Sequence, residues 1–168
     1  YKRQIKEYVK DTAAIKELDK RLKSIEKTKT GSNFAGFEAE DINGKAVNYE
    51  SLKGKLVYVD VWATWCKPCL QELPAMKALQ EEYKGKDITF VSLSVDKDKE
   101  AWKAMVTEEK MQGVQLHIDL GAHRDFIENY DLTGIPRFFL ISKEGKIISI
   151  SAPRPSEAKI KELINANL

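Results

Sequence analysis

The spacing of apolar positions changes several times along this chain of 168 residues, and each change marks a new element. From residue 34 onward, short apolar and β-branched runs, which predict strands, alternate with longer stretches of helical periodicity. We expect strands at 55–62, 88–95, 115–118, 137–142 and 146–151, and helices at 67–83, 99–109, 124–130 and 156–166.

Two turns complete the predicted topology. The run Asp41-Ile42-Asn43-Gly44, in which Asn-Gly is a strong hairpin signal, separates the extended segments 34–40 and 46–49. The run Lys143-Glu144-Gly145 joins the last two strands. Because helices separate the early strands and the last two strands form a hairpin, we predict an α/β fold with a mixed sheet covered by helices on both faces.

Residues 1–29 form a distinct first segment that contains neither proline nor glycine. Apolar side chains recur in it at helical spacing, at Tyr8, Ile15, Leu18, Leu22 and Ile25. A run of small and polar residues, 30–33, follows. We therefore predict an amphipathic helical extension or linker over residues 1–30 and one domain over residues 31–168.

Charge divides the chain at the same place. The net charge of +2 argues against nucleic-acid binding as the main task, but residues 1–30 carry +5 and the remainder carries −3. The basic face of this helix is either exposed to solvent without a partner or contacts anionic lipid, a removed domain or another subunit. No apolar run is long enough to span a bilayer, and none has the form of a signal peptide. Since the chain starts at Tyr1, we expect it to be processed or trimmed, with any targeting segment missing.

The two cysteines of the chain, Cys66 and Cys69, lie where a predicted strand gives way to a predicted helix. Free N–H groups and the positive dipole end at a helix N-terminus favour a thiolate, so we expect Cys66 to be the nucleophile and the more exposed thiol. Lys67 adds a positive charge that favours the thiolate, unless it is only a solvated lysine. Pro68 suits the first helical turn, where no donor is lost.

Two structural alternatives compete with redox chemistry for these cysteines. A closed zinc site needs four ligands, and the chain offers only His117 and His123 besides the cysteines. A purely structural disulfide that encloses two residues removes little entropy from the unfolded chain. We therefore favour a redox-active pair and expect neither a metal nor a cofactor.

Two separated motifs carry a family resemblance. The run Val59-Asp60-Val61-Trp62-Ala63-Thr64-Trp65-Cys66-Lys67-Pro68-Cys69 resembles the active-site segment of the thioredoxin superfamily, and Gly134-Ile135-Pro136 resembles its downstream proline loop. The run Gln71-Glu72-Leu73-Pro74, the N-terminal hairpin and an insertion between residues 95 and 130 are similar to TlpA/ResA-type thiol-disulfide oxidoreductases. That resemblance implies a thioredoxin-like fold and an extracytoplasmic, periplasmic or membrane-anchored, location.

The resemblance also implies roles for individual residues. Cys66 would attack a substrate disulfide and Cys69 would resolve the mixed disulfide. Pro136 would have a cis peptide bond, and the backbone of Ile135 would pair with an extended substrate. Trp65 would form an exposed shelf beside Cys66.

Three charged residues complete the candidate site. Asp60 would be a buried acid behind Cys69, with a raised pKa that lets it accept a proton from Cys69. Glu72 matches the acidic residue of ResA-like proteins, which usually lack the aspartate, so the proton acceptor remains open between the two. Arg137 would influence substrate preference.

The predicted function is reduction of protein disulfides through a dithiol/disulfide cycle, with protein thiols as substrates and an upstream thiol electron donor. A redox-inactive binding module and a thiol peroxidase are the alternatives.

Overall fold

A seven-stranded mixed sheet forms the centre of the computed structural model, which describes residues 12–168. The strands are β1 (Glu38–Asp41), β2 (Ala46–Asn48), β3 (Leu56–Trp62), β4 (Ile88–Ser94), β5 (Val114–His117), β6 (Arg137–Ile141) and β7 (Ile147–Ser149). Their order in the sheet is β2-β1-β5-β4-β3-β6-β7. Strand β3 pairs in parallel with β4, which pairs in parallel with β5, while the remaining pairs are antiparallel.

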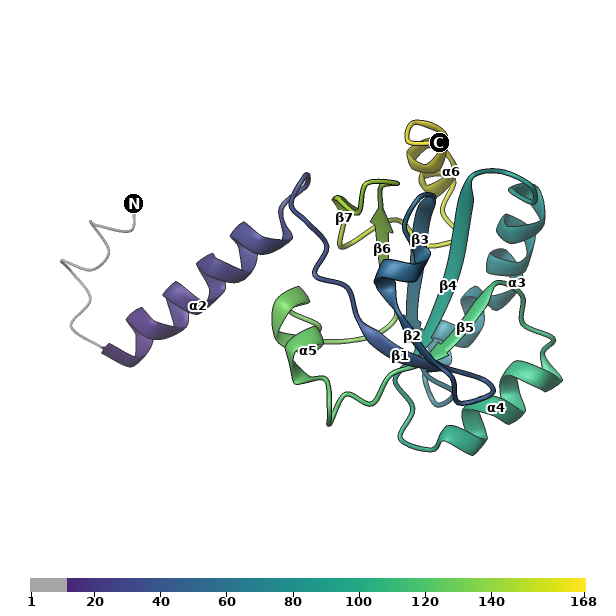
Figure 1. Ribbon diagram of the computed structural model, residues 1–168, viewed down its shortest axis with the longest axis horizontal. Coiled ribbons are helices and arrows are strands. Elements are labelled where there is room, and N and C mark those ends of the chain that lie inside the picture. Colours follow the sequence, from purple (N-terminus) through teal and green to yellow (C-terminus); the bar gives the residue numbers. More distant parts are fainter. Residues whose placement is uncertain (1–11) are drawn as a thin grey trace.

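Helices cover both faces of this sheet, as Figure 1 shows. The helices of the domain are α3 (Lys67–Glu82), α4 (Lys99–Glu108), α5 (Arg124–Tyr130) and α6 (Lys159–Asn165), with a short 3-10 helix at Tyr49–Leu52, and α2 (Thr12–Thr28) precedes them in the chain. Helices α3 and α6 pack with the Leu56 and Tyr58 side of β3, and α5 packs with the side formed by Val57, Val59 and Val61. The fold is therefore the α/β fold, with a mixed sheet covered by helices on both faces, that the alternation of elements predicts.

Strand β3 is buried at all of its positions because it lies inside the sheet with a helix layer on each side. Burial on both faces explains why its sequence is a continuous apolar run rather than an alternating one. Asp60 is the one charged residue in that run. The strand thus delivers its C-terminal end, and the cysteines that follow, to a fixed place at the edge of the core.

Helix α2 confirms part of the predicted N-terminal helix, while residues 1–11 lie outside the described residues. It extends away from the sheet in Figure 1 and contacts α5, where Lys27 Nζ lies 3.4 Å from Asn129 Oδ1. Two apolar side chains of its predicted apolar face remain exposed, Leu18 at 38% and Ile25 at 62%. The domain therefore leaves much of this apolar face uncovered.

The last helix starts later than its sequence pattern predicts. The expected start was residue 156, but α6 begins at Lys159. Both the backbone N–H and the hydroxyl of Ser156 donate to the carboxylate of Glu72 in α3. Ser156 therefore ties the preceding loop to α3 instead of opening the helix.

Candidate active site

The cysteine pair lies at the junction of β3 and α3, with Cys66 as the N-cap of the helix. The backbone N–H of Cys69 donates to Cys66 Sγ at an N···S distance of 3.3 Å. Cys66 and Cys69 form a disulfide with an S–S distance of 2.04 Å. The first sulfur thus occupies the position where helix N–H groups stabilise negative charge.

The prediction that Cys66 is the more exposed thiol concerns the reduced protein, whereas the structure contains the disulfide form. Both cysteines are only 4% exposed. They belong to a small apolar cluster with Trp62, Ala63 and Trp102, and Ile135 packs against that cluster. In the disulfide form both cysteines therefore lie in this cluster and are buried to the same extent.

Trp65, Lys67 and Pro68 form the solvent-facing part of the cysteine loop. Trp65 is 69% exposed, as expected for a shelf beside Cys66, and both Lys67 and Pro68 are exposed. Pro68 lies in the first turn of α3, where the missing N–H has no helical partner to lose. A large indole left in solvent beside a disulfide offers an apolar contact to an incoming chain.

The proline loop reaches the same place from β6. The Ile135–Pro136 peptide bond is cis, as the resemblance implies. Strand β6 starts at Arg137, which pairs with Val61 near the end of β3. Because Ile135 packs against the cluster that contains both cysteines, the loop and the disulfide are neighbours although residues 69 and 135 are far apart in sequence.

Asp60 is a deeply buried carboxyl group on the α3 side of the sheet. It shares one face of β3 with Tyr58 and Trp62, and Tyr58 packs in the same cluster as Met76 and Leu79 of α3. Burial raises the pKa of Asp60 from 3.8 to about 8, and the negative charge of Glu72 adds to this rise. The carboxyl group therefore holds its proton near neutral pH and is poised to exchange it.

Glu72 lies on the buried side of α3, one helical turn after Cys69. Its carboxylate accepts two hydrogen bonds from Ser156, from the backbone N–H and from the hydroxyl, each at 3.0 Å. The guanidinium Nη1 of Arg154 lies 3.8 Å from Glu72 Oε1. An ordinary surface position is thus excluded for Glu72, and its oxygens are engaged by the loop before α6.

Sequence reasoning missed Asp96, a buried residue that follows β4. Its carboxylate accepts hydrogen bonds from the backbone N–H and the hydroxyl of Thr64 and from the hydroxyl of Ser94. These bonds fix the segment just before Trp65 and Cys66. Because β3 and β4 are parallel neighbours, their carboxyl ends meet, which is the signal that could have pointed to Asp96.

The two histidines do not join the cysteines. His117 Nε2 lies 2.7 Å from the carbonyl oxygen of Asp96, and its ring packs against Trp102. His123 precedes α5. Over residues 12–168, no group of histidine, cysteine, aspartate and glutamate side chains is arranged to hold a metal ion.

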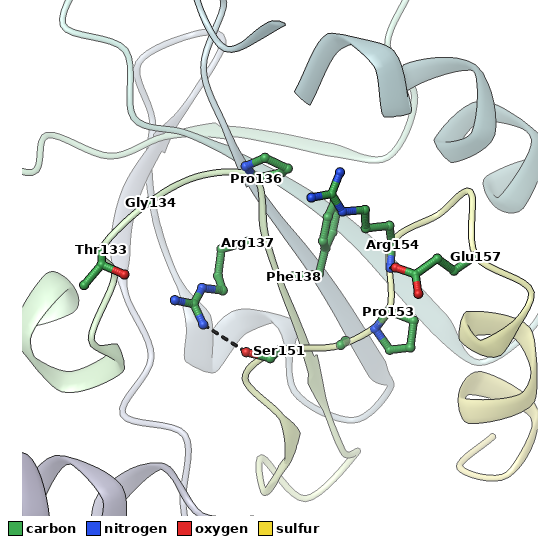
Figure 2. A pocket seen from close by; sticks show the side chains of 10 residues that line it. Thr133, Gly134, Pro136, Arg137, Phe138, Ser151, Pro153, Arg154 and Glu157 are labelled. Carbon is green, nitrogen blue, oxygen red and sulfur yellow. Dashed lines mark hydrogen bonds between the residues drawn. The ribbon is translucent and has the colours of Figure 1, made fainter. Parts of the chain in front are cut away.

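Two hollows meet at the proline loop. One, which we call the apolar groove, has a volume of about 1140 Å³ and is lined in part by Trp65, Val95, Leu120, Leu132 and Ile135. The other, which we call the arginine pocket, has a volume of about 430 Å³ and is lined in part by Pro136, Arg137, Phe138, Ser151, Pro153 and Arg154. Figure 2 shows the arginine pocket, and Thr133 and Gly134 border both hollows.

A disulfide at a helix N-terminus, a buried acid in the preceding strand and an adjoining cis-proline loop define the class of thioredoxin-like thiol-disulfide oxidoreductases. The model of the family Redoxin matches residues 29–164. The chain therefore belongs to the Redoxin family, and it is a TlpA/ResA-like thiol-disulfide oxidoreductase.

Relatives and solved structures agree with this assignment. The chain is 33% identical to thiol-disulfide oxidoreductase ResA of Bacillus subtilis over 80% of this chain and 74% of ResA. It is 28% identical to the thioredoxin domain of a thiol-disulfide oxidoreductase from Bacteroides vulgatus, with a TM-score of 0.74 over 82% of this chain and 96% of that domain. Another Bacteroides vulgatus protein, solved in solution, is 55% identical, with a TM-score of 0.71 over 79% of this chain and 86% of that one.

The structure also bears on a membrane-spanning segment. Between residues 12 and 168, none of the helices combines the length and the apolar character needed to cross a bilayer.

Proposed function

We propose that this protein reduces disulfides of polypeptide substrates, with Cys66 as the attacking and Cys69 as the resolving cysteine. The observation that carries the proposal is the N-cap position of Cys66, whose sulfur accepts the N–H of Cys69. In the reduced protein the same N–H and the helix dipole favour a Cys66 thiolate, which is the nucleophile in disulfide exchange. Lys67, next in the chain, adds positive charge.

The reaction then passes through a mixed disulfide. The Cys66 thiolate forms a bond to one substrate sulfur, and the other substrate sulfur leaves as a thiolate. Cys69 next attacks Cys66 Sγ, which restores the Cys66–Cys69 disulfide and releases the reduced substrate. Cys69 is suited to this step because it lies in the first turn of α3 beside Cys66.

Asp60 is our choice for the group that accepts the Cys69 proton. A pKa of about 8 makes the Asp60 carboxyl able to give up and take back a proton near neutral pH. Glu72 is the weaker choice because Ser156 donates two hydrogen bonds to its oxygens. In this proposal Glu72 holds the loop before α6 and raises the pKa of Asp60 through its charge.

The substrate chain would lie along the proline loop, with the backbone of Ile135 as its hydrogen-bonding partner and Pro136 beneath it. Trp65 and the apolar groove offer apolar contact next to this loop, and Arg137 lines the arginine pocket, which also borders the loop. The partners are thus protein thiols and disulfides, together with an upstream thiol donor that returns the cysteines to the reduced form.

We place this activity outside the cytoplasm, in the periplasm or at a membrane anchor facing it. Support comes from the resemblance to TlpA/ResA-type proteins, which face the extracytoplasmic side of bacteria and are often membrane-tethered. Residues 1–30, which include α2, would act as a linker between the domain and such a tether or a further domain.

The proposal is tested by mixing the reduced protein with a disulfide-bonded peptide and following both by mass spectrometry. We expect peptide reduction to accompany formation of the Cys66–Cys69 disulfide, and equilibration against glutathione to give a reducing potential. A protein that oxidises dithiol peptides but leaves disulfides intact would reverse the proposed direction. Consumption of hydrogen peroxide at a faster rate than peptide disulfide would favour the peroxidase alternative.

A further inference from the structure

The arginine pocket has a basic character that the disulfide chemistry does not require. Two guanidinium groups, those of Arg137 and Arg154, contribute to its lining. In the view of Figure 2 they lie on opposite sides of the strand that begins after Pro136. The pocket therefore places positive charge next to the proline loop, along which the substrate is proposed to lie.

Arg137 is the guanidinium group whose charge is least compensated. Its Nη1 donates to Ser151 Oγ at 2.9 Å, and its Nη2 lies 3.4 Å from the carbonyl oxygen of Asp131. Both acceptors are neutral, and none of the ion pairs found in residues 12–168 includes Arg137. Its two contacts hold the side chain in place and leave further N–H donors available.

Arg154 and the nearby carboxylates complete the charge distribution. The side chain of Arg154 is 48% exposed, and its Nη1 lies 3.8 Å from Glu72, a distance too long for a hydrogen bond. Glu157 is the carboxylate in the lining, and its Oε1 accepts the backbone N–H of Arg154. The lining thus contains two positive groups and one negative group that is already hydrogen-bonded.

We propose that the arginine pocket binds an aspartate or glutamate side chain of the polypeptide substrate, close in sequence to the cysteine that Cys66 attacks. Charge-assisted hydrogen bonds from arginine to carboxylate are among the stronger polar contacts in proteins. The pocket shares Pro136 with the loop along which the substrate is proposed to lie, so a residue near the target cysteine reaches it. This inference rests on the proposed function and adds a substrate preference to it.

The test uses matched disulfide-bonded peptides that carry Glu, Gln or Lys at each position flanking the cysteine in turn. The rate of attack by the reduced full chain is measured for the wild type, for Arg137→Gln and for Arg154→Gln. Arg124→Gln is the matched control, because Arg124 is an exposed residue at the start of α5 and does not line the pocket. A small disulfide with two carboxylates, compared with its amide, tests whether a polypeptide is needed.

At the preferred position, we expect the wild type and Arg124→Gln to attack the Glu peptide about tenfold faster than the Gln peptide. In Arg137→Gln this ratio should fall to about twofold or less, with a smaller fall in Arg154→Gln, because the rate with the Glu peptide falls more than the rate with the Gln peptide. The small disulfide with two carboxylates should be attacked no faster than its amide.

Equal rates for Glu and Gln peptides at every position in the wild type would overturn the inference. So would an unchanged ratio in both arginine variants. If the small dicarboxylate were attacked faster than its amide by the same factor as the Glu peptide over the Gln peptide, the pocket would not require a polypeptide substrate, and that part of the inference would be overturned. These failures differ from a failure of the proposed function, in which the reduced protein would attack none of the peptides, charged or neutral.

Discussion

Asp60 is the residue whose environment departs most from its ordinary chemistry. It lies in a fully buried strand, and its pKa is raised because burial disfavours the ionised form and Glu72 adds like charge. Between pH 3.8 and about 8, the Asp60 carboxyl group therefore keeps its proton in the folded protein but has lost it in the unfolded chain. Stability should fall as the pH rises through this window and should level off above it.

Replacing Asp60 by Asn should remove this pH dependence. We expect Asp60→Asn to raise the free energy of unfolding near pH 8 by at least about 1 kcal/mol and to change it much less near pH 4. Denaturant unfolding of the disulfide form over a pH series measures this, with the exposed Asp87→Asn as control. Parallel pH curves for wild type and Asp60→Asn would show that the Asp60 carboxyl titrates normally.

The same variant should slow one chemical step. If Asp60 accepts the Cys69 proton, Asp60→Asn should slow resolution of the mixed disulfide by roughly ten- to a thousandfold and change attack by Cys66 less. Glu72→Gln should slow resolution less than Asp60→Asn. Stopped-flow measurement of both steps decides the matter, since slowing of resolution in the Glu72 variant alone would identify Glu72 as the acceptor.

At the scale of elements, Asp96 connects the end of β4 to the loop that precedes the cysteines. We expect Asp96→Asn to lower the free energy of unfolding by about 1–3 kcal/mol, because an amide nitrogen replaces one of the oxygens that accept bonds from Thr64 and Ser94. The fluorescence of Trp65 should broaden or shift as its loop loosens. Unchanged stability and fluorescence would mean that the loop holds its place without Asp96.

Ser156 makes the corresponding connection between α3 and the loop before α6. Ser156→Ala removes the hydroxyl bond to Glu72 and keeps the backbone bond, so we expect a loss of about 1 kcal/mol in the free energy of unfolding. Thermal or denaturant unfolding measures the loss. A neutral effect would indicate that solvent or Arg154 replaces the lost donor at Glu72.

These two connections also mark where sequence patterns stop being informative. The continuous apolar run of β3 and the Cys-x-x-Cys pair are local features, so the strand, the following helix and the candidate nucleophile could be predicted. The contacts of Asp96 and Ser156 depend on which strands and loops become neighbours, and their local sequence favours a loop and a helix start respectively. Burial of Cys66 likewise depends on Trp102 and Ile135, which come from distant segments.

At the scale of the whole molecule, α2 contacts the domain mainly through α5 and leaves Ile25 exposed. Thr30 and Gly31, by contrast, donate hydrogen bonds to the carbonyl oxygens of Ile148 and Ile147 in β7. Removal of residues 1–28 should therefore leave the domain folded, with its rate of peptide reduction within about twofold of the full chain, because the contacts of α2 over residues 12–28 lie mainly with α5 rather than with the cysteines. Loss of folding on truncation would show that residues 1–28 are part of the domain.

The central claim is that Cys66 attacks and Cys69 resolves. It is tested most directly by incubating the Cys69→Ser and Cys66→Ser variants with a disulfide-bonded peptide and analysing the products by non-reducing mass spectrometry. We predict that Cys69→Ser accumulates a mixed disulfide between Cys66 and the peptide, while Cys66→Ser accumulates little. A mixed disulfide that forms on Cys69 as readily as on Cys66 would contradict the roles assigned to the two cysteines.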